Sequence, residues 1–384
     1  MEKKSKEELI ISLFQSNCIE LGNLRLKNGD VSKYYFNMKN IISYPNIIKI
    51  IGDEIYKNLE DFDIICGIPY GGLPVATYIS VEYNKPMIIL RDKAKNYGMG
   101  KLIEGEYKKE SRCVIIDDVI TTGGSIEDTI DKLKTQVNIV NIAVIFDRQQ
   151  NYKCSMPIFS LLNKNDVTRY KINKIINNNK LLCLAADIND PNKLLDLLNN
   201  VGDKIGICKI HYDCIDIHLC DDFINKLISL SIKHDFLIME DRKFVDISSI
   251  VEKQYNFFKN WVDLITVHGS VTNEVIQKLS GALIVANMSN NDYNLNDKST
   301  ELAKNNYNNV IGFISQNKIN CLDLITMTPG ISLTINKEED QKYRTIKDVK
   351  TDIYIVGRGI YKSRNPTITC NEYLSNIKNF KNKC

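Results

Sequence analysis

Short apolar runs alternate with helix-length segments of mixed polarity from residue 181 to the end of the chain. Eight such runs are present: LLCLAADI, IGICKIH, FLIMEDR, LITVHG, ALIVANM, VIGFIS, LITMTPG and DIYIVGRG. Each is short enough for a buried strand, and each is followed by enough chain for a helix. The pattern predicts a (β/α)8 barrel, that is, a TIM barrel. A doubly wound open sheet is the alternative, because it gives the same alternation.

The first 164 residues show a similar α/β alternation with fewer repeats. Strands of the buried type are expected at 63–69, 86–90, 113–119 and 139–147, separated by helical stretches such as 71–83. This order favours a mainly parallel sheet. Residues 165–180 are polar and rich in asparagine, so a linker carrying a short helix is expected there; an exposed helix of the front domain is the alternative. The predicted domains are therefore 1–164 and 181–384, joined by 165–180.

The composition is that of a soluble globular protein and gives no indication of a nucleic-acid-binding or membrane protein. The hydrophobic share of 43% and the charged share of 25% are ordinary for a soluble globular protein. A net charge of +3 gives no electrostatic reason to expect nucleic acid or a membrane as the main partner. The 11 cysteines include no C-x-x-C pair, and no apolar run approaches the length of a membrane span. We expect a cytoplasmic protein with reduced thiols.

The stretch VIIDDVITTGGS (114–125) combines two features of a binding site in the front domain. The glycines and the start of a helix present backbone N–H groups that suit a phosphate, and the hydroxyls of Thr121, Thr122 and Ser125 add donors. Asp117 and Asp118 would repel a phosphate, but they suit ribose hydroxyls or a magnesium ion. The stretch therefore predicts a site for a sugar phosphate.

Charged residues gather at the ends of the strands predicted for the second domain. Asp241 and Lys243 lie two residues apart, so they share one face of their strand, and Lys209 and His211 do the same on the preceding strand. Asp246 has the opposite parity and is expected on a loop. Lysines and a carboxylate that converge at the barrel mouth must interleave their charges, because unpaired buried charges are costly. A structural salt-bridge network is the alternative to a catalytic site.

The motif VIIDDVITTGG resembles the phosphoribosyl-diphosphate signature of type I phosphoribosyltransferases, which have a Rossmann-like fold. Four other segments, 26–37, 67–77, 91–105 and 147–150, narrow the resemblance to orotate phosphoribosyltransferase. It implies Mg²⁺ at Asp117 and Asp118, and a mobile cationic loop with Lys95 as a catalytic residue. The substrate-binding residues that it implies are Lys27, Tyr35, Phe36, Tyr70, Arg91, Lys93, Asp117, Asp118, Thr121, Thr122, Gly123, Gly124, Ser125 and Arg148. Gly71 stands where bacterial relatives carry a lysine, and Asp92 where the family usually has one.

Residues 181–364 look like orotidine 5′-monophosphate decarboxylase, and DRKFVD (241–246) matches its D-x-K-x-x-D motif. The resemblance implies that Lys209, Asp241, Lys243 and Asp246 form the catalytic array, with Asp246 reaching the partner subunit's site, and that no cofactor is needed. The substrate-binding residues that it implies are Asp187 and His211 at the ribose, Ser289 at the pyrimidine, Gln341 and Arg358 at the phosphate, and Ile247, Pro329 and Gly357.

Together the two resemblances point to the bifunctional uridine 5′-monophosphate synthases. They imply orotate, phosphoribosyl diphosphate and orotidine 5′-monophosphate as substrates, and a homodimer. Compared with animal bifunctional relatives the linker at 165–180 is short, which leaves little chain to cap the bottom of the barrel. Two rival hypotheses are a front half that only binds ligands and a barrel with another D-x-K-x-x-D activity, such as a hexulose-phosphate synthase.

Overall fold

The structure is a computed structural model that describes residues 1, 3–26, 29–91, 102–149, 152, 154–288, 294–334, 337–338 and 341–381. Its contacts divide the chain into two compact units. The first comprises Met1–Glu20 and Tyr35–Val167, and the second comprises Leu21–Tyr34 and Thr168–Cys384. The short segment Leu21–Tyr34 is therefore grouped with the C-terminal part of the chain, although most of the first unit follows it in sequence.

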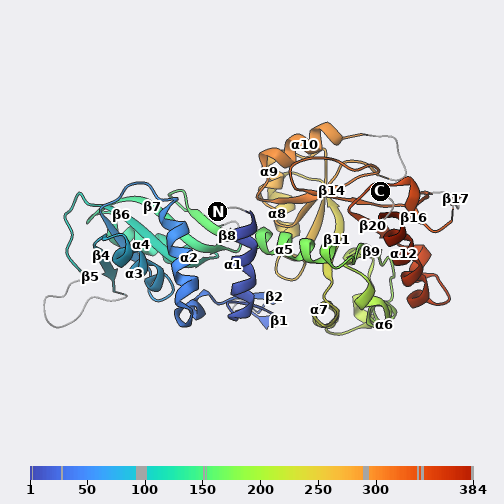
Figure 1. Ribbon diagram of the computed structural model, residues 1–384, viewed down its shortest axis with the longest axis horizontal. Coiled ribbons are helices and arrows are strands. Elements are labelled where there is room, and N and C mark those ends of the chain that lie inside the picture. Colours follow the sequence, from blue (N-terminus) through green and yellow to red (C-terminus); the bar gives the residue numbers. More distant parts are fainter. Residues whose placement is uncertain are drawn as a thin grey trace. The chain divides into compact units, whose positions relative to one another are not determined.

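The first unit is built on a six-stranded sheet in the order β5-β4-β3-β6-β7-β8 (Figure 1). Every neighbouring pair is parallel except β4–β5, which confirms the predicted mainly parallel sheet. Its central strands contain buried apolar runs, IICG in β3 and CVII in β6, as expected for strands covered on both faces. The elements are α1 (Lys3–Gln15), α2 (Pro45–Tyr56), β3 (Ile64–Gly67), α3 (Leu73–Glu82), β4 (Met87–Leu90), β5 (Ile103–Glu104), β6 (Arg112–Ile120), α4 (Gly124–Leu133), β7 (Asn138–Asp147) and β8 (Phe159–Asn163).

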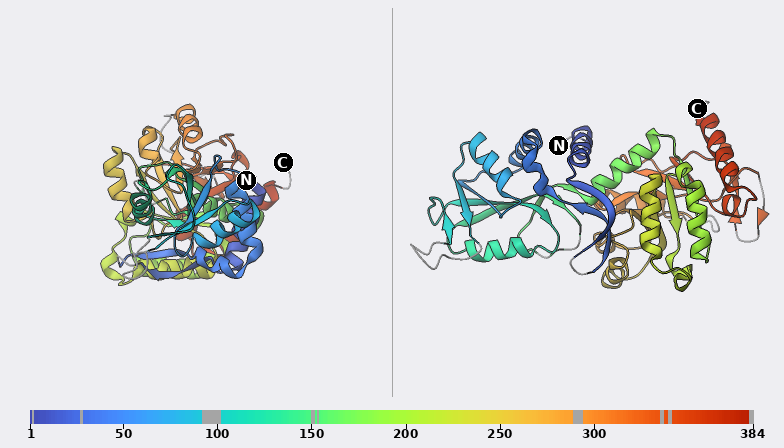
Figure 2. Two further views of the ribbon diagram at one scale, coloured as in Figure 1. Left: turned by 90° about the vertical axis from the view of Figure 1, so that its left-hand side faces the viewer. Right: turned by 90° about the horizontal axis from the view of Figure 1, so that it is seen from below.

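The second unit contains a closed barrel of eight parallel strands with helices around it (Figures 1 and 2). Pairing of β20 with β9 closes the barrel, so the predicted (β/α)8 fold is confirmed and the open sheet is excluded. The strands are β9 (Leu182–Ala185), β10 (Ile207–Ile210), β11 (Leu237–Phe244), β12 (Leu264–His268), β13 (Ala282–Val285), β14 (Val310–Ile314), β15 (Ile325–Thr328) and β20 (Ile353–Val356). The helices are α6 (Pro191–Val201), α7 (Phe223–His234), α8 (Ser248–Asn256), α9 (Asn273–Ile276), α10 (Asn296–Asn305), α11 (Arg358–Tyr361) and α12 (Pro366–Lys381).

Alternation along each barrel strand separates two apolar layers. On β9, Leu182 and Leu184 join the cluster between strands and helices, whereas Cys183 joins the cluster inside the barrel. On β10 the same alternation turns Cys208 outward and Lys209 inward. A lysine on the inner face is therefore placed by strand parity at the carboxyl end of the barrel, where enzymes of this fold carry their chemistry. Four shorter strands follow β15: β16 (Ile331–Ser332) with β19 (Arg344–Thr345), and β17 (Lys337–Glu338) with β18 (Gln341–Lys342).

Two elements that precede the barrel in sequence lie at the amino ends of its strands. Helix α5 (Lys164–Asn177) buries Ile172 and Ile175 in the cluster inside the barrel. The strands β1 (Ile19–Arg25) and β2 (Val31–Phe36) pair with each other, and their segment 21–34, which we call the hairpin, belongs to the second unit. The sequence predicted a helix within 165–180, but gave no sign that the helix would fill the bottom of the barrel.

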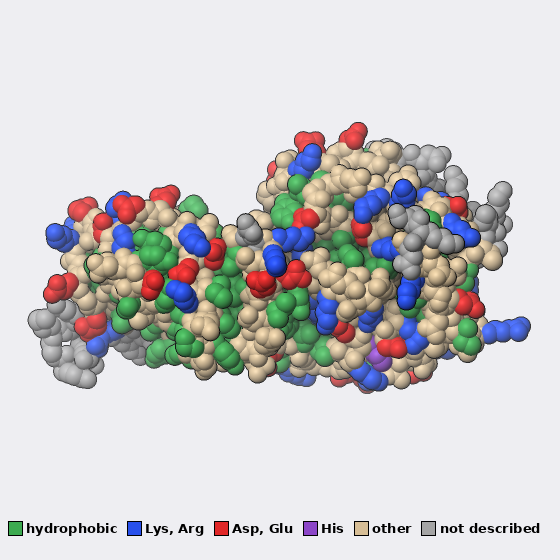
Figure 3. Space-filling view, viewed as in Figure 1, with side chains coloured by type: hydrophobic (Ala, Val, Ile, Leu, Met, Phe, Trp, Pro, Cys, Tyr) green, Lys and Arg blue, Asp and Glu red, His purple; other side chains and the backbone are tan. Residues whose placement is uncertain are grey.

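Charges of both signs are mixed on the molecular surface. On the face shown in Figure 3, lysine and arginine side chains are interspersed with aspartate and glutamate over elements of both units. This mixing agrees with the small net charge of +3. Among the described residues, no helix combines the length and the apolar character that crossing a bilayer requires.

Candidate active sites

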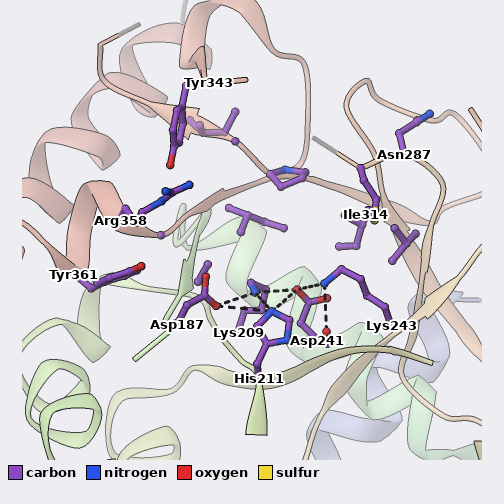
Figure 4. Close-up of a pocket in the computed structure, with 18 of the residues that line it drawn as sticks. Asp187, Lys209, His211, Asp241, Lys243, Asn287, Ile314, Tyr343, Arg358 and Tyr361 are labelled. Atoms are coloured by element: carbon purple, nitrogen blue, oxygen red, sulfur yellow. Dashed lines mark hydrogen bonds and ion pairs between the residues drawn. The ribbon is translucent and has the colours of Figure 1, made fainter. Parts of the chain in front are cut away.

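Five ionisable side chains of the second unit converge at the carboxyl ends of β9, β10 and β11 (Figure 4). Lys209 Nζ lies 2.8 Å from Asp241 Oδ2 and 3.3 Å from Asp187 Oδ1. Lys243 Nζ lies 2.9 Å from the same oxygen of Asp241. Asp241 and Lys243 therefore meet, as their shared strand parity predicted. His211 stands beside them, with Nε2 3.0 Å from Lys209 Nζ.

The charges in this array support one another. Burial opposes ionisation of Asp241, but Lys209, Lys243 and His211 together hold its pKa well below the ordinary value. Burial also opposes the charge on Lys209, yet the carboxylates of Asp241 and Asp187 raise its pKa above the ordinary value. Asp241 therefore remains a carboxylate and Lys209 an ammonium at neutral pH, as interleaved charges require.

Thr266 of β12 forms hydrogen bonds to two residues of this array. Its buried hydroxyl donates to Asp241 Oδ1 at 2.8 Å and accepts the backbone N–H of Lys243 at 3.0 Å. Lys243 has a left-handed backbone with φ of 54°, which is uncommon for a residue other than glycine. Thr266 thus fixes the carboxylate and the backbone that carries the amine. Thr266 was not predicted from the sequence; the available signal was a hydroxyl within the apolar run LITVH.

The array lines one side of a cavity of about 760 Å³. Of the predicted residues, Pro329, Gly357 and Arg358 also line it, and Arg358 and Tyr343 lie on the opposite side from Lys243 in Figure 4. The guanidinium of Arg358 lies 5.7 Å from the centre of the Tyr343 ring. Tyr343, Tyr361 and Lys362 were not predicted. The cavity therefore has a charged array on one side and an arginine on the other, which suits an elongated anionic ligand.

The remaining residues predicted for the barrel have other positions. Asp246 and Ile247 are exposed and do not line this cavity, and Asp246 Oδ1 accepts the backbone N–H of Ile247 at 2.8 Å. Ser289 lies outside the described residues, and the side chain of Gln341 is likewise not described.

The residues predicted for a sugar-phosphate site in the first unit lie at the end of β6. Asp117 and Asp118 are both buried there, and the Asp118 backbone N–H donates to Asp117 Oδ1 at 2.8 Å. Burial and the neighbouring Asp118 raise the pKa of Asp117 to about 7. Lys39, which the sequence did not single out, pairs with Asp118 at 3.1 Å.

The loop after β6 leads directly into a helix, as predicted. Thr121 and Thr122 precede Gly123, which has a φ of 82° that favours glycine, and α4 begins at Gly124 with Ser125 in its first turn. This places helix N–H groups beside the two carboxylates, the combination that the sequence predicted for a sugar phosphate. Among the described residues no group of three or more Asp, Glu, His or Cys side chains could hold a metal alone. The carboxylate pair instead suits Mg²⁺ shared with a substrate's oxygens, because Mg²⁺ commonly takes one or two carboxylates.

Other predicted residues of the first unit surround the same edge of the sheet or flank it. Phe36 stacks on Phe146 with ring centres 4.1 Å apart, and the Arg148 guanidinium lies 5.8 Å from the Phe36 ring centre. Tyr70 is 75% exposed, and Tyr35 is also exposed. Arg91 pairs with Glu104 at 2.5 Å. Lys27, Lys93 and Lys95 lie outside the described residues.

Comparison with known proteins assigns a different family to each part of the chain. Residues 180–373 match the family model "Orotidine 5′-phosphate decarboxylase / HUMPS family", and residues 37–172 match "Phosphoribosyl transferase domain". Uridine 5′-monophosphate synthase of Bos taurus is 28% identical over 449 residues, which cover 93% of each chain.

Relatives with a single activity match the two parts separately. Orotate phosphoribosyltransferase of Pyrococcus horikoshii is 37% identical over 155 residues, covering 39% of this chain and 83% of its own. Orotidine 5′-phosphate decarboxylase of Komagataella pastoris is 37% identical over 213 residues, covering 48% of this chain and 81% of its own.

Proposed function

The chain belongs to the orotate phosphoribosyltransferases in its front part and to the orotidine 5′-phosphate decarboxylase / HUMPS family in its barrel, and from this we infer that it catalyses the last two steps of UMP biosynthesis. The first step joins orotate to phosphoribosyl diphosphate and releases diphosphate. The second step removes CO₂ from orotidine 5′-monophosphate and leaves UMP. Uridine 5′-monophosphate synthase of Bos taurus aligns over 93% of this sequence. In this chain the phosphoribosyl transferase match precedes the decarboxylase match.

The observation that carries the decarboxylase assignment is the array of Lys209, Asp241 and Lys243 inside the barrel cavity. Loss of CO₂ leaves an electron pair on a ring carbon with little delocalisation. An ammonium held beside that carbon stabilises the developing negative charge and then supplies the proton that replaces CO₂. Asp241 would keep Lys243 in place, and Arg358 across the cavity would bind the phosphate of the nucleotide. These steps use side chains alone, so we predict no cofactor for this half.

The transferase half would use the carboxylates and loop at the end of β6. Asp117 and Asp118 would hold the ribose hydroxyls and, with the substrate, Mg²⁺, while the N–H groups of Gly123 to Ser125 would receive the 5′-phosphate. When held there, Mg²⁺ would supply positive charge that offsets the charge of the leaving diphosphate. Orotate would lie near Phe36 and Arg148, because the guanidinium is suited to a carboxylate.

One assay tests the whole assignment. The full chain, given orotate, phosphoribosyl diphosphate and Mg²⁺, should produce UMP, diphosphate and CO₂. With EDTA added, orotate should no longer be consumed, whereas supplied orotidine 5′-monophosphate should still lose CO₂. Failure to consume orotate would mean that the front half only binds ligands. A metal requirement for the barrel reaction would favour chemistry of the hexulose-phosphate synthase type.

We also propose that the active form is a homodimer. The support is the exposed position of Asp246 and Ile247 just after β11, since the resemblance implies that this motif reaches the partner subunit's site. Location in the cytoplasm remains a prediction from the sequence.

Thr266 provides a test of how the array is held. Thr266→Val keeps the shape of the side chain but removes the hydroxyl that joins Asp241 to the Lys243 backbone. A hydrogen bond to a charged group is worth about 1.5–3 kcal/mol. We therefore expect kcat for supplied orotidine 5′-monophosphate to fall about tenfold to 150-fold, with KM nearly unchanged. Thr266→Ser is the matched control, because it restores the hydroxyl and should recover most of kcat. Equal kcat values for the valine and serine variants would show that Thr266 only fills space.

A further inference from the structure

The amino end of the barrel contains a buried carboxylate whose partners come from far away in the sequence. Asp263 immediately precedes β12 and is almost completely buried. Its Oδ2 accepts the backbone N–H of Ile238 at 2.8 Å and the ammonium of Lys33 at 2.5 Å, and its Oδ1 accepts the hydroxyl of Tyr34. Lys33 itself is 0% exposed. Both Lys33 and Tyr34 belong to the hairpin.

Further contacts hold the hairpin against the same end of the barrel. Lys33 Nζ donates to Ser231 Oγ at 2.7 Å, and the Lys33 backbone N–H donates to the carbonyl of Asn260 at 3.0 Å. Asn23 Nδ2 donates to Ser229 Oγ at 2.7 Å. Ser229 and Ser231 lie on α7, just before β11, and Asn260 lies just before β12. These barrel residues all precede strands, so they lie at the amino end of the barrel. The hairpin therefore covers the end opposite the catalytic array, which lies at the carboxyl ends of the strands.

Helix α5 contributes a second buried lysine to this cluster. Lys171 Nζ lies 3.4 Å from the Tyr34 hydroxyl. Burial, together with the charge of Lys33, lowers the pKa of Lys171 to about 8. Burial opposes ionisation of Asp263, but Lys33 and Lys171 lower its pKa below the ordinary value. Lys33 is therefore the direct ionic partner of Asp263, and its removal would leave a buried carboxylate without a salt-bridge partner in contact.

We propose that the hairpin is the floor of the decarboxylase barrel, so that the stability of the second activity depends on a segment that precedes the first activity in the chain. The hairpin covers the amino end of the barrel around Asp263. The strand β2 continues from Lys33 and Tyr34 into Tyr35 and Phe36, which belong to the predicted orotate segment. One strand thus serves both halves, and the two enzymes are interleaved in sequence.

The test uses the full chain with Lys33→Met, which keeps the length of the side chain and removes its charge. Breaking a buried pair costs far more than breaking an exposed one, so the temperature that inactivates decarboxylation of supplied orotidine 5′-monophosphate should fall by about 10 °C. Activity at low temperature should remain, because Lys33 is remote from the catalytic array. Lys57→Met is the matched control: Lys57 makes an exposed pair of 2.7 Å with Glu54, and its loss should shift the same temperature by about 1 °C or less. Equal shifts for the two variants would overturn the proposal.

Two further measurements test the proposal even if the Lys33→Met variant does not fold. Adding Asp263→Asn to Lys33→Met leaves no unpaired carboxylate in the floor, so the double variant should regain part of the lost stability. In the unaltered chain, hydrogen exchange in increasing urea should show the amides of 21–34 losing protection together with those of β11 and β12. Exposure of the hairpin amides at much lower urea than the barrel strands would refute a structural floor, whether or not the assigned reactions are correct.

Discussion

Lys243→Ala is expected to abolish decarboxylation while orotate consumption continues at the rate of the unaltered enzyme. The side chain of Lys243 is 34% exposed within the cavity, and its amine is held 2.9 Å from Asp241. Alanine would remove both the charge that we propose stabilises the carbanion and the proton that we propose replaces CO₂. Loss of one preorganised electrostatic contact costs about 10²–10³ in rate, and loss of a general acid costs about 10²–10⁴. We therefore expect a fall of about 10⁵-fold in kcat, measured as CO₂ release from supplied orotidine 5′-monophosphate.

A neighbouring cation on the same strand gives the matched control. Arg242 precedes Lys243 but pairs with Asp213 and does not line the cavity. Arg242→Ala should therefore retain decarboxylation within a few fold. Loss of both activities in Lys243→Ala would argue against independent sites, and retained CO₂ release would remove Lys243 from the reaction.

The parts of this architecture that were predictable follow from short-range patterns. Eight apolar runs are sufficient to predict the barrel, because each strand and its following helix are contiguous in sequence. Asp241 and Lys243 were placed together by strand parity, which depends only on their spacing of two residues. The loop after Asp118 was equally predictable from local sequence, since a strand, two glycines and a helix occur in direct succession.

The parts that escaped prediction depend on contacts between distant segments. Thr266 acts through hydrogen bonds to the neighbouring strand, and nothing in LITVH indicates which residues face its hydroxyl. Lys33 ends the polar stretch KNGDVSK, yet it is fully buried because Asp263, 230 residues later, supplies its charge partner. A charged residue in a polar segment is ordinarily solvated, so burial of this kind is visible only in the fold.

Gly71→Ala is expected to impair the transferase strongly while barely changing its stability. A Cβ at Gly71 would lie 2.0 Å from Cγ of Asp118 and 2.1 Å from its Oδ2. The clash is with the end of a side chain, so the carboxylate can rotate away without displacing the backbone. Rotation would take Asp118 from Lys39, its ion-pair partner, and from the place where we propose that it meets ribose or Mg²⁺. The same clash excludes the lysine that the resemblance places here in bacterial enzymes, unless Asp118 moves.

Because a misplacement of about 1 Å can cost 10²-fold in rate, kcat/KM for phosphoribosyl diphosphate should fall by about 10²-fold or more. Orotate consumption measures this loss, and decarboxylation of supplied nucleotide should be unchanged. Gly72→Ala separates the two kinds of clash: its Cβ would lie 2.1 Å from the backbone oxygen of Ile116 in β6, so that variant should lower the unfolding temperature of the first unit. Wild-type kcat/KM in Gly71→Ala would mean that the position of the Asp118 carboxylate does not limit catalysis, and the role proposed for Asp118 would then fail.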